Sequence, residues 1–122
     1  MKFTLVKKEN QSKARVGEIV TDHGSVKSPV FMPVGTLGTV KGINPIELNR
    51  EVQSPMLLTN TYHLYLRPGT ETLENAGGVH RFINWNRPIL SDSGGYQVFS
   101  LSNNRTLKDE GAYFQSHIDG SS

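Results

Sequence analysis

The chain contains no cysteine among its 122 residues. Disulfide bonds are therefore excluded, and a zinc site built within this segment would have to use histidine and carboxylate ligands. The four histidines, His23, His63, His80 and His117, show none of the paired spacings of metal-binding motifs. The residues themselves predict no metal site in this segment.

Long apolar runs are also missing. The N-terminal residues lack the hydrophobic stretch of a signal peptide, and no segment approaches the roughly 20 apolar residues that cross a membrane. We therefore expect a cytoplasmic protein that does not associate with membranes. The charge excess is small, with a formal net charge of +2, which suits a nucleic-acid partner without requiring one.

Antiparallel strands are predicted at the start of the chain. Runs of β-branched residues at 3–6, 14–20 and 26–32 are separated by polar turns. The run at 29–35 is almost entirely apolar, which is typical of a strand buried on both faces.

Helices and strands are predicted to alternate after residue 42. Asn44 is a suitable N-cap and Pro45 suits a first helical turn, while Gly77 and Gly78 would end a helix at 70–76. Apolar runs at 55–60 and 88–92 predict buried strands, and a hairpin with its turn at 109–111 and its second strand at 112–116 should follow. Alternating strands and helices predict an α/β fold with βα units and a parallel sheet.

The segment at 90–97 reads Leu-Ser-Asp-Ser-Gly-Gly-Tyr-Gln and is the richest in functional groups. Asp92 ends a predicted parallel strand, where α/β enzymes place catalytic groups. Tyr96 could stack on a base, and Gly94 and Gly95 would let a ligand approach the backbone. Ser93 and Gln97 could form hydrogen bonds to the edge of that base. The segment therefore predicts a purine pocket made of Asp92, Ser93, Gly94, Gly95, Tyr96 and Gln97.

The same segment also fits a plain polar turn, in which Asp92 caps a helix and Tyr96 packs in the core. Asn60, at the end of the preceding strand, could orient a catalytic carboxylate, whereas His63 suits a structural role. Ser116, His117 and Asp119 do not predict a hydrolase triad, because neighbouring residues of a strand point to opposite faces.

Four motifs together resemble a known enzyme family. They are Met-Pro-Val-Gly-Thr at 32–36, Thr-Asn-Thr-Tyr-His-Leu-Tyr-Leu-Arg-Pro-Gly at 59–69, Arg-Pro-Ile-Leu-Ser-Asp-Ser-Gly-Gly-Tyr-Gln-Val-Phe-Ser-Leu at 87–101, and Ser-His-Ile-Asp-Gly-Ser at 116–121. In this order they resemble the tRNA-guanine transglycosylases, also called queuine tRNA-ribosyltransferases. The resemblance implies one catalytic domain with a TIM (β/α)8 barrel, of which residues 1–28 would form a small antiparallel sheet and residues 29–122 the first, truncated part of the barrel.

The resemblance also implies an activity. In the family, guanine at the anticodon wobble position of tRNA is exchanged for a 7-deazaguanine precursor of queuosine by double displacement. Two carboxylates share the work, one as nucleophile toward ribose and the other as general acid and base. Matched by motif, Asp92 would be the acid and base, the four residues that follow it would form the base pocket, and Gln97 and Asn60 would support them.

Other expectations concern the rest of the protein. The family's nucleophilic aspartate and its structural zinc site of three cysteines and one histidine would follow Ser122, so we expect the isolated segment to be inactive. The Gly94-Gly95-Tyr96 sequence resembles the bacterial and eukaryotic branches of the family, and the short N-terminal region favours the bacterial type. The loop at 36–41 is a candidate contact in a homodimer. The partners would be tRNA, guanine and the deazaguanine base. The alternatives are a non-catalytic tRNA-binding relative of the same fold and a binding module complete at 122 residues.

Overall fold

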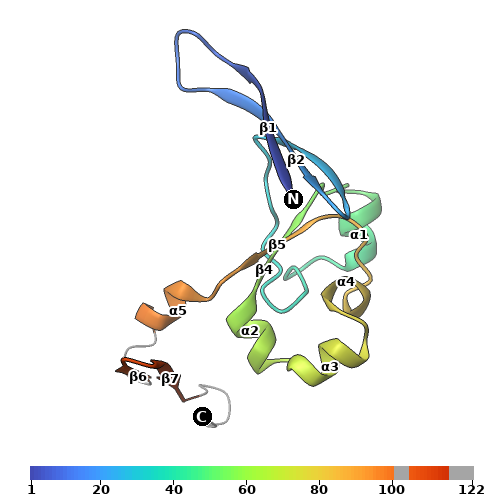
Figure 1. Cartoon of the computed structure of the whole chain (residues 1–122). Coiled ribbons are helices and arrows are strands. Elements are labelled where there is room, and N and C mark those ends of the chain that lie inside the picture. Colours follow the sequence, from blue (N-terminus) through green and yellow to red (C-terminus); the bar gives the residue numbers. More distant parts are fainter. Residues whose placement is uncertain (101–104, 116–122) are drawn as a thin grey trace.

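The computed structural model describes residues 1–100 and 105–115, which form three sheets and five helices (Figure 1). In chain order the elements are β1 (Lys2–Lys8), β2 (Arg15–Thr21), β3 (Gly24–Ser28), α1 (Pro45–Arg50), β4 (Leu57–Asn60), α2 (Thr61–Leu66), α3 (Thr70–Asn75), α4 (Val79–Phe82), β5 (Ile89–Asp92), α5 (Gly95–Ser100), β6 (Arg105–Lys108) and β7 (Gly111–Phe114).

The N-terminal strands form an antiparallel sheet in the order β1-β2-β3, as the sequence predicts. β2 and β3 are joined by a tight turn, with Thr21 paired to Gly24. The longer connection between β1 and β2 forms an arm that projects away from the rest of the chain (Figure 1). β3 ends at Ser28 rather than at residue 32, because Pro29 has no N–H group with which to continue the ladder.

The segment at 29–35 differs from the buried strand expected for it. It is extended and forms one parallel bridge, between Val34 and Leu58, supported by hydrogen bonds from Gly35 N to Leu58 O and from Leu58 N to Pro33 O. Phe31 is 81% exposed and Val34 is 58% exposed. Two prolines interrupt the possible ladder, and no second strand among the described residues lies along its other side.

The parallel pair β4–β5 confirms the predicted βα arrangement. The strands are in register from Leu57 opposite Ile89 to Asn60 opposite Asp92. α1 precedes them and begins with a complete capping box, in which the Asn44 side chain accepts from Glu47 N and the Glu47 carboxylate accepts from Asn44 N. The described residues thus form an α/β structure with two antiparallel sheets and one parallel sheet, while the closed barrel stays a prediction.

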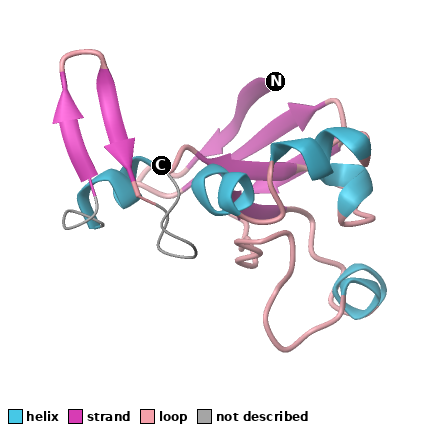
Figure 2. Ribbon diagram, turned by 90° about the horizontal axis from the view of Figure 1, so that it is seen from below, coloured by secondary structure: helices cyan, strands magenta, loops and turns pink. Residues whose placement is uncertain are grey.

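Three short helices connect β4 to β5. α3 matches the predicted helix, and Gly77 and Gly78 follow it with φ values of +83° and +102°. The sequence pattern does not predict α4, which has only four residues, or α2, which follows β4 directly, with Asn60 as both the last residue of the strand and the N-cap of the helix. The predicted hairpin is present as β6–β7, but its second strand begins at Gly111 and ends at Phe114; it lies to one side of the molecule, beyond α5 (Figure 2).

A small core lies between α1 and one face of the parallel pair. Leu48, Leu57 and Trp85 are buried there, and partly buried Val40, Ile43, Ile83 and Ile89 pack around them. Trp85 also donates its indole N–H to Pro88 O. The opposite face of the pair is more open, since Leu90 is 41% exposed. Within the described ranges, no helix has both the length and the apolar character needed to cross a membrane.

Arg87 ties the start of β5 to α1. Its guanidinium donates to Ser54 O at 2.7 Å and to Asn49 O at 3.1 Å, and it lies 5.7 Å from the centre of the Trp85 ring. These contacts fix where β5 begins and therefore where the strand ends, at Asp92.

Thr59 provides a test of this packing. Its side chain is 1% exposed, and its hydroxyl oxygen has no hydrogen-bond partner among the described residues. A buried hydroxyl without a partner costs about 1 to 3 kcal/mol. We expect Thr59→Val, which keeps the shape and removes the hydroxyl, to raise the free energy of unfolding by about 1 kcal/mol in a denaturant titration.

Thr61→Val is the matched control for this substitution, because the Thr61 hydroxyl lies 2.9 Å from the Ser91 hydroxyl and is hydrogen-bonded to it. This variant should gain no stability. A loss of stability in Thr59→Val would contradict the interpretation.

Candidate active site

The site forms where the two parallel strands end. Asn60 is the last residue of β4, Asp92 is the last residue of β5, and the two are register partners. Because parallel strands end at the same edge of a sheet, two polar residues 32 positions apart in the sequence meet there. The sequence suggests that Asn60 could orient a catalytic carboxylate, and in the structure its side chain contacts that of Asp92.

The Asp92 carboxylate is held through both of its oxygen atoms. Oδ2 accepts a hydrogen bond from Asn60 Nδ2 at 3.1 Å, and Oδ1 accepts one from Gly94 N at 3.2 Å. The side chain is only partly buried. Each oxygen retains a second lone pair, so the carboxylate is oriented and can still interact with a ligand.

Asn60 has a single orientation that satisfies this arrangement. Its Oδ1 accepts from His63 N at 3.2 Å and so caps α2. The Nδ2 group must then face the other way, where it contacts Asp92 Oδ2 and, at 3.3 Å, Gln97 Oε1. Because Asn60 is only 7% exposed, packing and hydrogen bonding together fix its amide as a donor to the carboxylate.

Gly94 is required by the local structure. Its φ is +80°, and a Cβ atom at this position would lie 2.9 Å from Tyr62 Cβ. The sequence suggested that Gly94 and Gly95 leave room for a ligand. A Cβ on Gly94 would instead meet a side chain of α2, whereas a Cβ on Gly95 would meet only Ser93 Oγ, at 3.5 Å.

Tyr96 lies on α5 and is 74% exposed. The alternative in which Tyr96 packs in the core is therefore wrong for the described residues. The other part of that alternative, a polar turn before a helix, is present, because the Asp92 carboxylate accepts a hydrogen bond from Gly94 N immediately before α5 begins. The turn and an accessible aromatic ring thus occur together.

A cavity of about 170 Å³ opens beside Asp92. Of the predicted residues, Asp92, Asn60 and Gln97 line it, whereas Ser93, Gly94, Gly95 and Tyr96 do not. Its full lining is Val34, Thr36, Leu58, Thr59, Asn60, His63, Asp92 and Gln97. The sequence favours a structural role for His63. Its place in the lining follows from α2, which the sequence pattern does not reveal.

A larger, mainly apolar cavity of about 750 Å³ adjoins the first and shares Val34, Thr36 and His63 with it. The loop at 36–41, predicted to contact a second subunit, supplies much of the remaining lining, together with exposed Phe31. This cavity has no carboxylate in its lining. Of these two cavities, the smaller one is therefore the one lined by a carboxylate.

Metal ligands do not gather in the part of the chain that the structure describes, where no three His, Asp or Glu side chains lie together. The ligands of the structural zinc that the resemblance implies would follow Ser122, and this zinc site stays a prediction. The Ser-His-Ile-Asp-Gly-Ser motif at 116–121 and residue 101 of the third motif lie outside the described residues.

Comparison with known proteins shows the family of the chain. The family model described as queuine tRNA-ribosyltransferase matches residues 9–122. Proteins named queuine tRNA-ribosyltransferase from a Thermoanaerobacter species and from Ruminiclostridium cellulolyticum are each 56% identical, over 99% and 98% of this chain. The one from Enterococcus faecalis is 52% identical over 99% of this chain. In each case the match covers 32% of the relative, so the chain spans about a third of the length of these proteins. By these matches along nearly all of its length, the chain belongs to the queuine tRNA-ribosyltransferase family.

Proposed function

We propose that the protein carrying this segment exchanges guanine at the wobble position of tRNA for a 7-deazaguanine precursor of queuosine, with Asp92 transferring protons to and from the bases. The observation that carries the proposal is the Asp92 carboxylate, which is oriented by Asn60 and Gly94 and faces a cavity at the end of two parallel strands. The names of the relatives supply the substrate class.

The chemistry of base exchange requires such a group. A nucleophilic aspartate outside this segment would bond to the ribose anomeric carbon as the bond from that carbon to guanine breaks. The departing guanine must gain a proton, which Asp92 would donate. The incoming deazaguanine then attacks the same carbon, displaces the nucleophile and returns a proton to Asp92, so that no proton is consumed over the cycle.

Asn60 would position Asp92 for these transfers. Its amide already donates to the carboxylate and cannot rotate without losing the cap of α2. Gln97, whose Oε1 accepts from the same amide, would steady it from the side of α5. Two helices and two strands would in this way hold one carboxylate in place.

The base would stack on Tyr96, because its ring is exposed and lies in the first turn of α5, directly after the turn that holds Asp92. Ser93 would bond to the edge of the base, and Gly94 and Gly95 would keep the adjacent backbone open on that side. In the full-length protein we further propose a cytoplasmic homodimer of the bacterial type, with the loop at 36–41 and exposed Phe31 in the contact.

Asp92→Ala tests the catalytic assignment in a protein of the relatives' full length. Loss of a general acid and base lowers rates by about 100- to 10,000-fold, so incorporation of labelled guanine into tRNA should become undetectable. Binding of tRNA should change little, because phosphate contacts dominate affinity. Asp109→Asn, in the exposed β6–β7 turn, is the control. Undiminished exchange by Asp92→Ala would refute the role and would favour a non-catalytic tRNA-binding relative.

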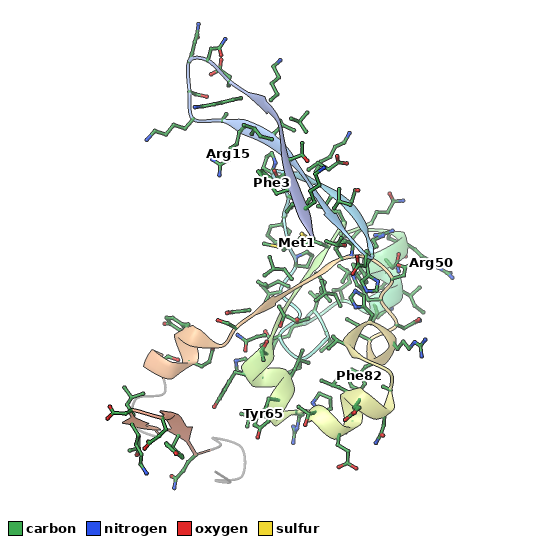
Figure 3. The ribbon with its side chains drawn as sticks, in the orientation of Figure 1. Met1, Phe3, Arg15, Arg50, Tyr65 and Phe82 are labelled. Atoms are coloured by element: carbon green, nitrogen blue, oxygen red, sulfur yellow. The ribbon has the colours of Figure 1, made fainter. Side chains whose placement is uncertain are left out.

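Tyr96→Ala tests the stacking role. Base stacking contributes about 1 to 3 kcal/mol, so the KM for the free base should rise by at least about fivefold while Tyr96→Phe stays near the wild type. Tyr65→Ala is a matched control, because Tyr65 is 64% exposed and points outward from α2 (Figure 3). An unchanged KM in Tyr96→Ala would remove Tyr96 from the base pocket.

Asn60→Asp tests positioning separately from folding. The new carboxylate can still cap α2, but it cannot donate to Asp92 and places a second negative charge beside it. We expect kcat to fall by about tenfold or more with little change in the KM for the base or in the thermal unfolding midpoint. Equal losses of activity and of thermal stability would instead indicate a merely structural residue.

A further inference from the structure

Two histidines outside the candidate site lie against each other. His23 belongs to the turn between β2 and β3, and His80 belongs to α4. Their ring centroids are 3.5 Å apart and the ring planes differ by 15°, so the rings are stacked. The contact joins the antiparallel sheet to the helical layer, two parts of the molecule that are far apart in the sequence.

His80 is also anchored on its other side. Its Nε2 lies 3.0 Å from Arg87 O, and its backbone oxygen accepts from Trp85 N at 2.9 Å. A carbonyl can only accept, so Nε2 carries the hydrogen in the neutral ring. No further hydrogen bond to the His80 ring is present among the described residues, and a proton added at Nδ1 would therefore gain no partner in the fold.

We propose that the stacked rings of His23 and His80 form an acid-sensitive latch, which holds the β2–β3 turn on α4 at neutral pH and releases it in mildly acidic solution. Two stacked neutral imidazoles attract each other by dispersion between their ring atoms. Two stacked imidazolium ions repel each other at short range in a partly buried place.

The charges around His80 support this behaviour. Burial lowers the pKa of His80 below its ordinary 6.5, the charge of His23 lowers it further, and the Arg87 carbonyl offsets part of this change. Three charged side chains neighbour the stacked rings. Asp22 is exposed on the same turn as His23, and the Arg81 side chain lies against Gly77. The Arg87 guanidinium donates to Ser54 O and Asn49 O.

The sign of the pH effect follows from this lowered pKa. The docked state binds the proton on His80 less readily than the undocked state does. The latch is therefore at full strength above pH 6.5 and weakens as the pH falls from 6.5 through the pKa of docked His80. This inference does not depend on the proposed function.

Hydrogen exchange provides the first test, using the whole protein at about pH 7.5 and about pH 5.5 and correcting for the intrinsic effect of pH on exchange. We expect the β2–β3 turn to exchange severalfold faster at the lower pH, while β1 serves as an internal reference. His23→Phe keeps a ring in the stack but removes the repulsion between two charged rings, so its turn should lose part of this pH dependence while the part due to the burial of His80 stays. Equal protection of the wild-type turn at both pH values, or full pH dependence in His23→Phe, would overturn the latch.

A second measurement uses the wild-type protein, so its main result does not depend on the folding of a variant. The titration of His80, followed by nuclear magnetic resonance of its ring proton in the wild-type protein, should have a midpoint below 6.5. A midpoint at or above 6.5 would overturn the proposal. In His23→Phe the midpoint should rise toward 6.5 because the charged neighbour is gone, and an unchanged midpoint would count against coupling between the rings.

Discussion

The hydrogen bond from Asn60 to Asp92 is the contact on which the arrangement of the candidate site depends. It crosses between the last residues of two parallel strands and exists because the strands are in register there. The direction of the bond is set by α2, since the same side chain must offer its oxygen to His63 N. One amide therefore links strand pairing, the start of a helix and the orientation of a carboxylate.

The rest of the described structure supports the position of that contact. Arg87 and Trp85 hold the residues before β5 against α1 and the core, so the strand starts from a defined place. Gly94 allows the chain after Asp92 to turn closely over Tyr62 and to direct its N–H to the carboxylate. A buried core on one side of the strands and a cavity at their ends thus serve different purposes, stability and chemistry.

Membership in the queuine tRNA-ribosyltransferase family supports the proposal that this geometry serves an exchange of bases on tRNA. The segment would contribute the proton-transferring carboxylate and one wall of the cavity. Chemistry at the ribose would need groups from the remaining two thirds of a protein of the relatives' length. The half-open face of β4 and β5 and the exposed Phe31 and Val34 are surfaces that further strands could cover.

The sequence by itself determined the features that depend on near neighbours. Asn44 and Pro45 predicted the start of α1, and Gly77 predicted the end of α3, because caps and helix stops are made by residues a few positions apart. It also predicted that strands end at Asn60 and Asp92, since each residue ends an apolar run. Only the tertiary structure decided what depends on distant contacts, namely the exposure of Phe31, the place of His63 in the cavity wall and the stacking of His23 on His80. Burial and ring contacts depend on which distant segments pack against a residue, and no local sequence pattern encodes that packing.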